Sequence, residues 1–219
     1  TRKNRDAARR IASETFVLLK NDNSILPLSK KGTIALVGPL AEAGTNMSGS
    51  WSVVADLKRH KSLRQGFEDA IRGKAKLVYA KGANLEDDPA LEAAATGGRT
   101  IRDSRSAEEM LAEAIAVAKD ADVIVAAVGE SAEYSGESSS RSILTLPKSQ
   151  KRLLEAMLAT GKPVVMLNFS GRPTVMLWES ENIPAIMNVW FGGSEAADAI
   201  ADVVFGDICP SGKLTASMP

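Results

Sequence analysis

The feature that most constrains this chain is an uninterrupted apolar run at residues 123–128, VIVAAV. Its β-branched and small residues predict a strand buried on both faces, as in the middle of a parallel sheet. At Gly129 the run breaks into a polar loop. In open α/β sheets ligands bind beyond the carboxyl ends of the strands, so this loop is the first place to look for chemistry. It carries three carboxylates, Glu130, Glu133 and Glu137.

Strand-like and helix-like segments alternate along the rest of the chain. This alternation predicts an α/β fold: a three-layer sandwich with a mainly parallel central sheet and helices on both faces. No linker divides the sequence, so we expect a single domain over residues 1–219. The expected strands are 33–37, 77–80, 123–128, 163–168 and 185–190, and the expected helices are 4–20, 62–71, 89–95, one beginning at Ser106, 149–160 and 194–205.

Composition argues against several classes of protein. Lys plus Arg and Asp plus Glu both number 27, so the net charge of zero gives no support for a nucleic-acid or anionic-membrane partner. No apolar run approaches the roughly 20 residues of a membrane helix. A single cysteine, Cys209, excludes an internal disulfide, and a single histidine, His60, argues against a Ser-His-Asp hydrolase or a multi-histidine metal site. Because the chain begins at Thr1 inside a helical pattern, we interpret it as a piece of a longer protein.

Nucleotide binding is a common use of such a sheet, but the motifs for it are missing. Neither GxGxxG nor GxxxxGK[ST] follows any predicted strand, and the turn at Gly38-Pro39 offers one glycine. Ser170 has no nucleophile-elbow pattern around it. A nucleotide-binding domain is therefore only the third alternative.

Trp51 lies in a loop of small residues after a predicted strand. Its ring would be either a platform for a sugar face or a plug that closes the loop onto the core. Trp178 and Trp190 lie in apolar runs, so we expect both in the core, and we expect His60 on the surface.

The three loop glutamates allow different interpretations. Glu133 is expected to be solvated, whereas Glu130 directly follows the strand and could bind backbone N–H groups of the next loop. Glu137 lies among small residues, with Arg141 four positions later. Such a setting would let its carboxyl group reach another domain.

Many short fragments together resemble one known family, the C-terminal α/β sandwich domain of glycoside hydrolase family 3, which contains β-glucosidases and β-xylosidases. Each fragment is weak alone, but their order and spacing match over nearly the whole chain. The fragments are SETFVLLKNDNSILPL (13–28), IALVGP (34–39), GSW (49–51), YAKG (79–82), VGE (128–130), Glu137, Arg141, Leu146-Pro147, Gln150, GKPVV (161–165), GRP (171–173), WF (190–191), Gly193 and PSGKL (210–214).

The resemblance implies a role for each candidate residue. In this family a preceding (β/α)8 barrel supplies an aspartate nucleophile, and the second domain supplies the general acid/base, which falls on Glu137 by motif position, with Glu130 as a less favoured candidate. Retaining glycosidases need two such carboxyl groups about 5–5.5 Å apart, one of them with a raised pKa. Trp51, Glu130 and Arg141 are expected to bind substrate.

The family further implies a β-linked glucoside or xyloside substrate, no cofactor or metal, and a periplasmic or secreted location. Its N-acetylglucosaminidase branch uses an Asp-His pair in the barrel, so the presence of Glu137 favours the glucosidase or xylosidase type. The chain alone, without a barrel, is expected to be inactive. The alternative is a non-catalytic carbohydrate-binding or scaffold domain.

Overall fold

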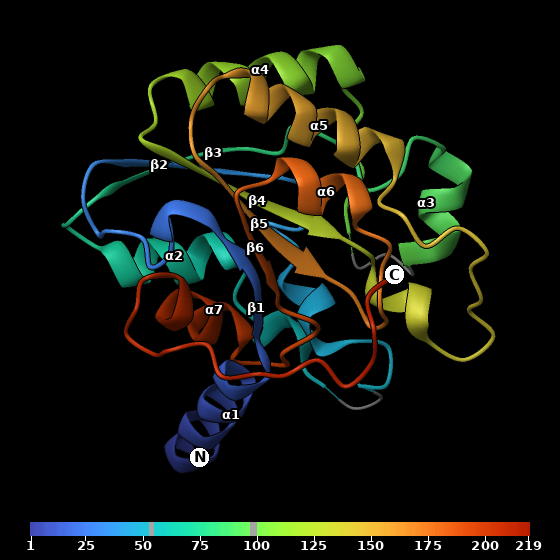
Figure 1. The fold of residues 1–219 in the computed structure, drawn as a ribbon. Coiled ribbons are helices and arrows are strands. Elements are labelled where there is room, and N and C mark those ends of the chain that lie inside the picture. Colours follow the sequence, from blue (N-terminus) through green and yellow to red (C-terminus); the bar gives the residue numbers. More distant parts are fainter. Residues whose placement is uncertain (53–54, 97–99) are drawn as a thin grey trace.

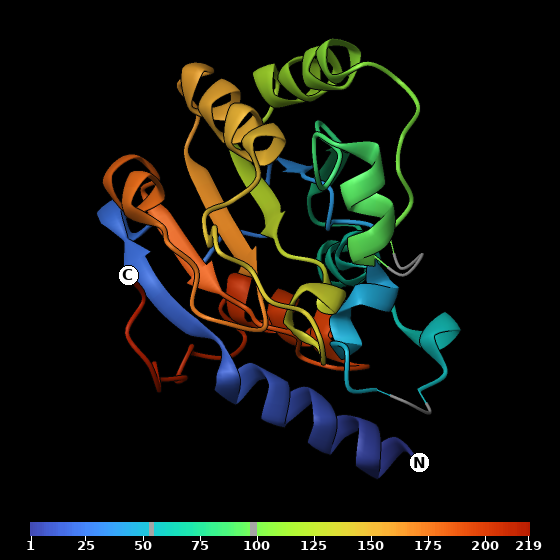
Figure 2. The same ribbon diagram turned by 90° about the vertical axis from the view of Figure 1, so that its right-hand side faces the viewer.

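The computed structural model describes residues 1–52, 55–96 and 100–219, and its ribbon is shown from two sides in Figures 1 and 2. Within these residues six strands form one sheet, in the order β1-β6-β5-β4-β2-β3. Only β1 and β6 pair antiparallel, so the predicted mainly parallel sheet is confirmed. The strands are β1 (Val17–Asn21), β2 (Thr33–Val37), β3 (Lys76–Ala80), β4 (Val123–Gly129), β5 (Val164–Phe169) and β6 (Ala185–Asn188).

Helices cover both faces of the sheet, as Figure 1 shows. Helices α2 and α7 pack together under one face, and α4, α5 and α6 lie over the other. Helix α1 projects from the body of the domain beside α7 (Figure 2). The helices are α1 (Arg2–Thr15), α2 (Leu63–Ile71), α3 (Pro89–Thr96), α4 (Ala107–Lys119), α5 (Lys148–Ala159), α6 (Leu177–Asn182) and α7 (Ala196–Val204).

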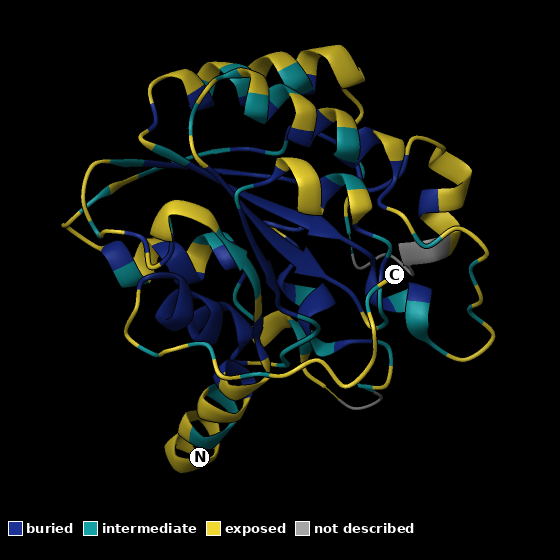
Figure 3. Cartoon of the chain, in the orientation of Figure 1, coloured by how far each residue is buried: buried dark blue, intermediate teal, exposed yellow. Residues whose placement is uncertain are grey.

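Alternate residues of the central strands serve two separate cores. Leu36 and Val125 point into the core beneath α2 and α7, whereas Val37 and Ala126 point into the core beneath α4 and α5. This follows from the two-residue period of a strand. The central strands are accordingly buried over nearly their whole length, as Figure 3 shows, and the run at residues 123–128 lies in the middle of a parallel sheet as predicted.

The N-terminal prediction was partly wrong. The helix expected over residues 4–20 ends at Thr15, and Phe16 turns the backbone into the antiparallel edge strand β1. Residues 16–19 are all apolar, and so short a run fits the period of a helix or a strand equally well. Pairing of Val17 with Asn188 of β6 decides for the strand.

Three further placements differ from expectation. Trp178 and Trp190 are half-buried, not core residues. Trp178 packs on the edge of one core with Lys151 over its ring, and the Trp190 indole donates to the Thr15 carbonyl at 3.2 Å. His60 is half-buried with Nδ1 2.7 Å from the Ser48 hydroxyl, and burial lowers its pKa.

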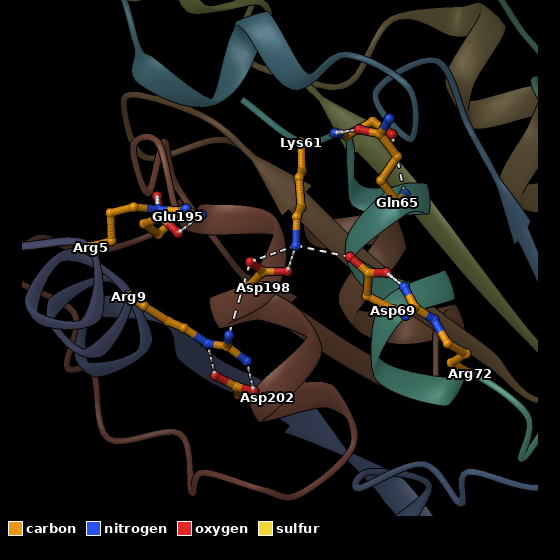
Figure 4. Close-up of polar contacts among 10 residues, drawn as sticks. Arg5, Arg9, Lys61, Gln65, Asp69, Arg72, Glu195, Asp198 and Asp202 are labelled. Atoms are coloured by element: carbon orange, nitrogen blue, oxygen red, sulfur yellow. Dashed lines mark hydrogen bonds and ion pairs between the residues drawn. The ribbon is translucent and has the colours of Figure 1, made fainter. Parts of the chain in front are cut away.

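Charged side chains hold α1 against α7 (Figure 4). Arg5 forms two hydrogen bonds to Glu195 (2.8 and 3.1 Å), and Arg9 forms two to Asp202 (2.6 and 2.5 Å). Lys61 places its ammonium group 2.9 Å from carboxylate oxygens of both Asp198 and Asp69, which joins α7 to α2. Few apolar residues of α1 are buried, so ion pairs provide much of this contact.

Candidate functional site

The loop that follows β2 and the loop that follows β4 meet at the carboxyl edge of the sheet. At this point, between β2 and β4, the strand order reverses. The Asn46 side chain accepts a hydrogen bond from the Ala132 N–H at 2.7 Å and donates to the Glu130 carbonyl at 3.4 Å. A Cβ at Gly136 would lie 3.1 Å from the Ser50 side chain. The two loops are therefore packed together (Figure 2), at the kind of position where open α/β sheets bind ligands.

Glu137 lies at the tip of a tight turn in the loop after β4. The Ser139 N–H donates to the Gly136 carbonyl at 3.2 Å, and Ser138 takes a positive φ of 60°. The Glu137 side chain is exposed, and none of the described residues gives its carboxylate a hydrogen bond or ion pair. The turn thus presents a carboxylate that is available to a ligand or to a second domain.

Glu130 is placed quite differently, because it is 1% exposed and surrounded by cations. Its Oε1 lies 3.1 Å from the Arg141 guanidinium, and its Oε2 lies 3.4 Å from Nε of Arg172. Burial raises the pKa of Glu130, and the positive charges of Arg141 and Arg172 oppose that shift. Paired in this way, a carboxylate can be held within the protein at a tolerable cost in solvation.

A second acid extends this cluster. The Tyr134 hydroxyl donates to the carboxylate of Glu86, which lies 4.0 Å from the Arg141 guanidinium. That guanidinium also stacks 4.4 Å above the Tyr134 ring. Burial raises the pKa of Glu86, while the hydrogen bond from Tyr134 and the charge of Arg141 lower it. Arg141 is thereby fixed on three sides by two acids and an aromatic face.

Trp51 is 68% exposed, which excludes the plug interpretation of its ring. Its neighbour Ser50 packs against Gly136, the residue before Glu137. Trp51 and Glu137 are therefore carried by adjacent segments at the same edge of the sheet. Of the four predicted site residues, Glu130 and Arg141 contact each other directly, and Glu137 and Trp51 lie on neighbouring turns.

Sequence reasoning did not single out Arg172, Glu86, Tyr134 or Asn46 as site residues. Arg172 belongs to the GRP fragment after β5. That position at a strand end was a usable signal, because β5 neighbours β4. Glu86 and Asn46 lie in loops that approach the loop after β4 only because of the strand order in the sheet. The local sequence around these two residues does not encode that strand order.

The surroundings of the site bear on ligand classes. An open hollow of about 270 Å³ lies beside the turn and is lined by Glu86, Tyr134, Ser139 and Arg141, among others. Within the described ranges, no group of three or more His, Cys, Asp or Glu side chains could hold a metal ion. In the same part of the chain, every helix is too short or too polar to cross a membrane.

Comparison with known proteins gives consistent matches. A family model described as the glycosyl hydrolase family 3 C-terminal domain matches residues 16–219. The chain is 44% identical over 221 residues to a periplasmic beta-glucosidase of Salmonella typhimurium, covering 100% of this chain and 29% of that protein. It is 35% identical over 225 residues to a beta-xylosidase of Formosa agariphila, with the same 100% and 29% coverage.

Solved structures agree. A beta-glucosidase from Listeria innocua, solved in complex with isofagomine, matches with a TM-score of 0.83 and 32% identity over 100% of this chain and 27% of that one. The chain thus spans less than a third of the length of these relatives. It belongs to glycosyl hydrolase family 3, in which it forms a C-terminal domain.

Proposed function

We propose that residues 1–219 form one domain of a retaining, exo-acting β-glycosidase and supply its general acid/base, Glu137. The observation that carries this proposal is the exposed carboxylate of Glu137, at the tip of a turn beside Trp51. No described side chain forms a hydrogen bond or an ion pair with this carboxylate. Glu130, in contrast, is buried and paired with Arg141, so its carboxylate is not available to a ligand in the same way.

The proposed reaction divides the work between two domains. An aspartate from a preceding (β/α)8 barrel attacks the anomeric carbon, and Glu137 donates its proton to the departing glycosidic oxygen. In the second step Glu137 takes a proton from water, which attacks the glycosyl-enzyme and releases the aspartate. Enclosure of a carboxyl group between two domains favours the neutral form that the first step requires.

The substrate class follows from the relatives and from Trp51. The relatives include a beta-glucosidase and a beta-xylosidase, and we infer that the substrate carries a terminal β-linked glucosyl or xylosyl residue. An exposed indole ring can pack against the C–H face of such a sugar. Glu130 and Arg141 lie behind the turn, and Arg141 lines the hollow beside it. No cofactor takes part in this scheme.

Two further proposals concern the whole protein. The isolated chain should not hydrolyse glycosides, because the nucleophile belongs to the barrel. One relative is described as periplasmic, which supports a periplasmic or secreted location for the full protein.

The test uses Glu137→Gln in the full-length enzyme, with Glu133→Gln as a matched control in the same loop. Loss of the general acid should lower kcat/KM for an unactivated β-disaccharide by roughly 10²–10⁴-fold and affect a dinitrophenyl glycoside much less. Azide should restore turnover of the activated substrate and yield the β-glycosyl azide. An equal loss for both leaving groups, without rescue, would instead favour a non-catalytic carbohydrate-binding or scaffold domain.

A further inference from the structure

We propose that Glu130, Arg141 and Arg172 are positioning residues whose buried ion cluster fixes the turn that carries Glu137. The proposal rests on the function proposed above for Glu137. It assigns the three side chains to holding the acid/base in place, and not to contact with the sugar.

The fixed end of the cluster is the strand end that bears Glu130. The Glu130 N–H donates to the Phe169 carbonyl of β5 at 2.7 Å. Gly129, the residue before Glu130, is held by the buried Gln150 side chain. The Gln150 amide accepts a hydrogen bond from the Gly129 N–H at 2.7 Å and donates one to the Gly129 carbonyl at 2.9 Å. The Glu130 backbone is therefore tied directly to the end of the sheet.

Two arginines connect the part of the loop around Glu137 to this anchor. Arg141 follows the turn, and its guanidinium reaches Glu130 Oε1 at 3.1 Å. Arg172 comes from the next loop, places Nε 3.4 Å from Glu130 Oε2, and donates from Nη2 to the Ser139 carbonyl at 3.4 Å. Because Ser139 and Arg141 lie two and four residues after Glu137, both tethers act on the turn itself.

The turn has little else to hold it. Residues 136–140 are Gly136, Glu137 and three serines, so no apolar side chain of this segment enters either core. Before the turn, Tyr134 is buried and bonded to Glu86. The loop is thus anchored before Glu137 by Tyr134, and directly after Glu137 the ion cluster holds it through Ser139 and Arg141.

The burial of Glu130 separates positioning from substrate binding. Its side chain is 2% exposed, whereas the side chains of Arg141 and Arg172 are 18% and 20% exposed. A sugar hydroxyl cannot reach a carboxylate enclosed in this way. Loss of one arginine would leave Glu130 buried without full compensation and release the turn.

The test measures Arg141→Met in the full-length protein, in the native and Glu137→Ala backgrounds. In the native background we expect kcat for an unactivated β-disaccharide to fall about 10–100-fold with KM changed less than about 2-fold, because a small misplacement of a catalytic group has effects of this size. Azide should partly restore turnover of a dinitrophenyl glycoside. In the Glu137→Ala background the same substitution should cause almost no further loss.

Two control variants make the result interpretable. Arg9→Met removes an equally charged side chain from the α1–α7 contact and should leave kcat unchanged. Arg172→Lys keeps the positive charge near Glu130 and loses the second donor, which bonds Ser139. This variant should fold, and its kcat should fall less than that of Arg141→Met. The fall should again be larger for the disaccharide than for the dinitrophenyl glycoside. If Arg141→Met does not fold, Arg172→Lys carries the test.

Three outcomes would overturn the proposal. If Arg141→Met lowers kcat equally in the native and Glu137→Ala backgrounds, Arg141 acts independently of Glu137. If Arg141→Met raises KM and leaves kcat unchanged, Arg141 binds the substrate directly. Full activity of Arg172→Lys on the poor leaving group would remove Arg172 from the cluster. Failure of the function proposed above is recognised separately, because Glu137→Ala alone would then hydrolyse the disaccharide normally.

Discussion

Gly129 joins strand β4 to the candidate site, and we predict that Gly129→Ala is strongly destabilising. This glycine has a φ of 131° and pairs with Phe169 of β5. A Cβ added here would lie 2.0 Å from the Phe169 carbonyl oxygen, although carbon–oxygen contacts normally begin near about 3.3 Å. The two strands must therefore move apart by about 1 Å.

The free-energy cost of Gly129→Ala has two parts, a lost hydrogen bond and an unfavourable backbone conformation. Separation of the strands would break the 2.7 Å hydrogen bond from the Glu130 N–H to the same carbonyl, at about 0.5–1.5 kcal/mol. The positive φ adds about 1–2 kcal/mol for a residue with a Cβ. We expect Gly129→Ala to lower the free energy of unfolding by about 1.5–3.5 kcal/mol in total, a shift readily seen in urea titrations followed by far-UV circular dichroism.

Gly161→Ala is the matched control. Gly161 also has a positive φ, 73°, but a Cβ there would meet nothing within 4 Å. It should show only the backbone cost, offset in part by the reduced entropy of the unfolded chain. If the two variants unfold within about 0.5 kcal/mol of each other, the steric reasoning about the β4–β5 contact is wrong.

Two other substitutions test electrostatics away from the turn. Arg9→Met should lower the free energy of unfolding by about 0.5–1 kcal/mol at low salt and by less in 1 M NaCl, since the Arg9–Asp202 pair is partly exposed; equal Tm shifts at both salt concentrations would contradict this. Burial raises the pKa of Glu179 above 4.5, so this group makes the fold less stable as pH rises from about 4.5 through its folded pKa. Glu179→Gln should therefore raise the urea midpoint more at pH 7 than at pH 4.5, and a uniform change would refute the assignment.

Local sequence patterns determined much of the fold. The apolar runs of β2, β4 and β5 are typical of strands that are buried on both faces of a parallel sheet. They could therefore be predicted as strands without knowing which strands they pair with. The start of α4 was equally local, because Ser106 and Glu109 form a capping box within one turn of chain. The motif around Glu137 also identified the loop in which the exposed carboxylate is found.

Tertiary structure decided what depends on distant partners. Residues 17–21 became a strand because β6 lies beside them, and the loop that carries Trp51 lies beside the turn of Glu137 because Ser50 meets Gly136. Glu130 and Glu137 are both loop glutamates in the sequence, but only Glu130 is buried, where Arg172 from the loop after β5 approaches it. Which carboxylate is enclosed and which is presented depends on strand order, and strand order follows from packing over the whole sheet.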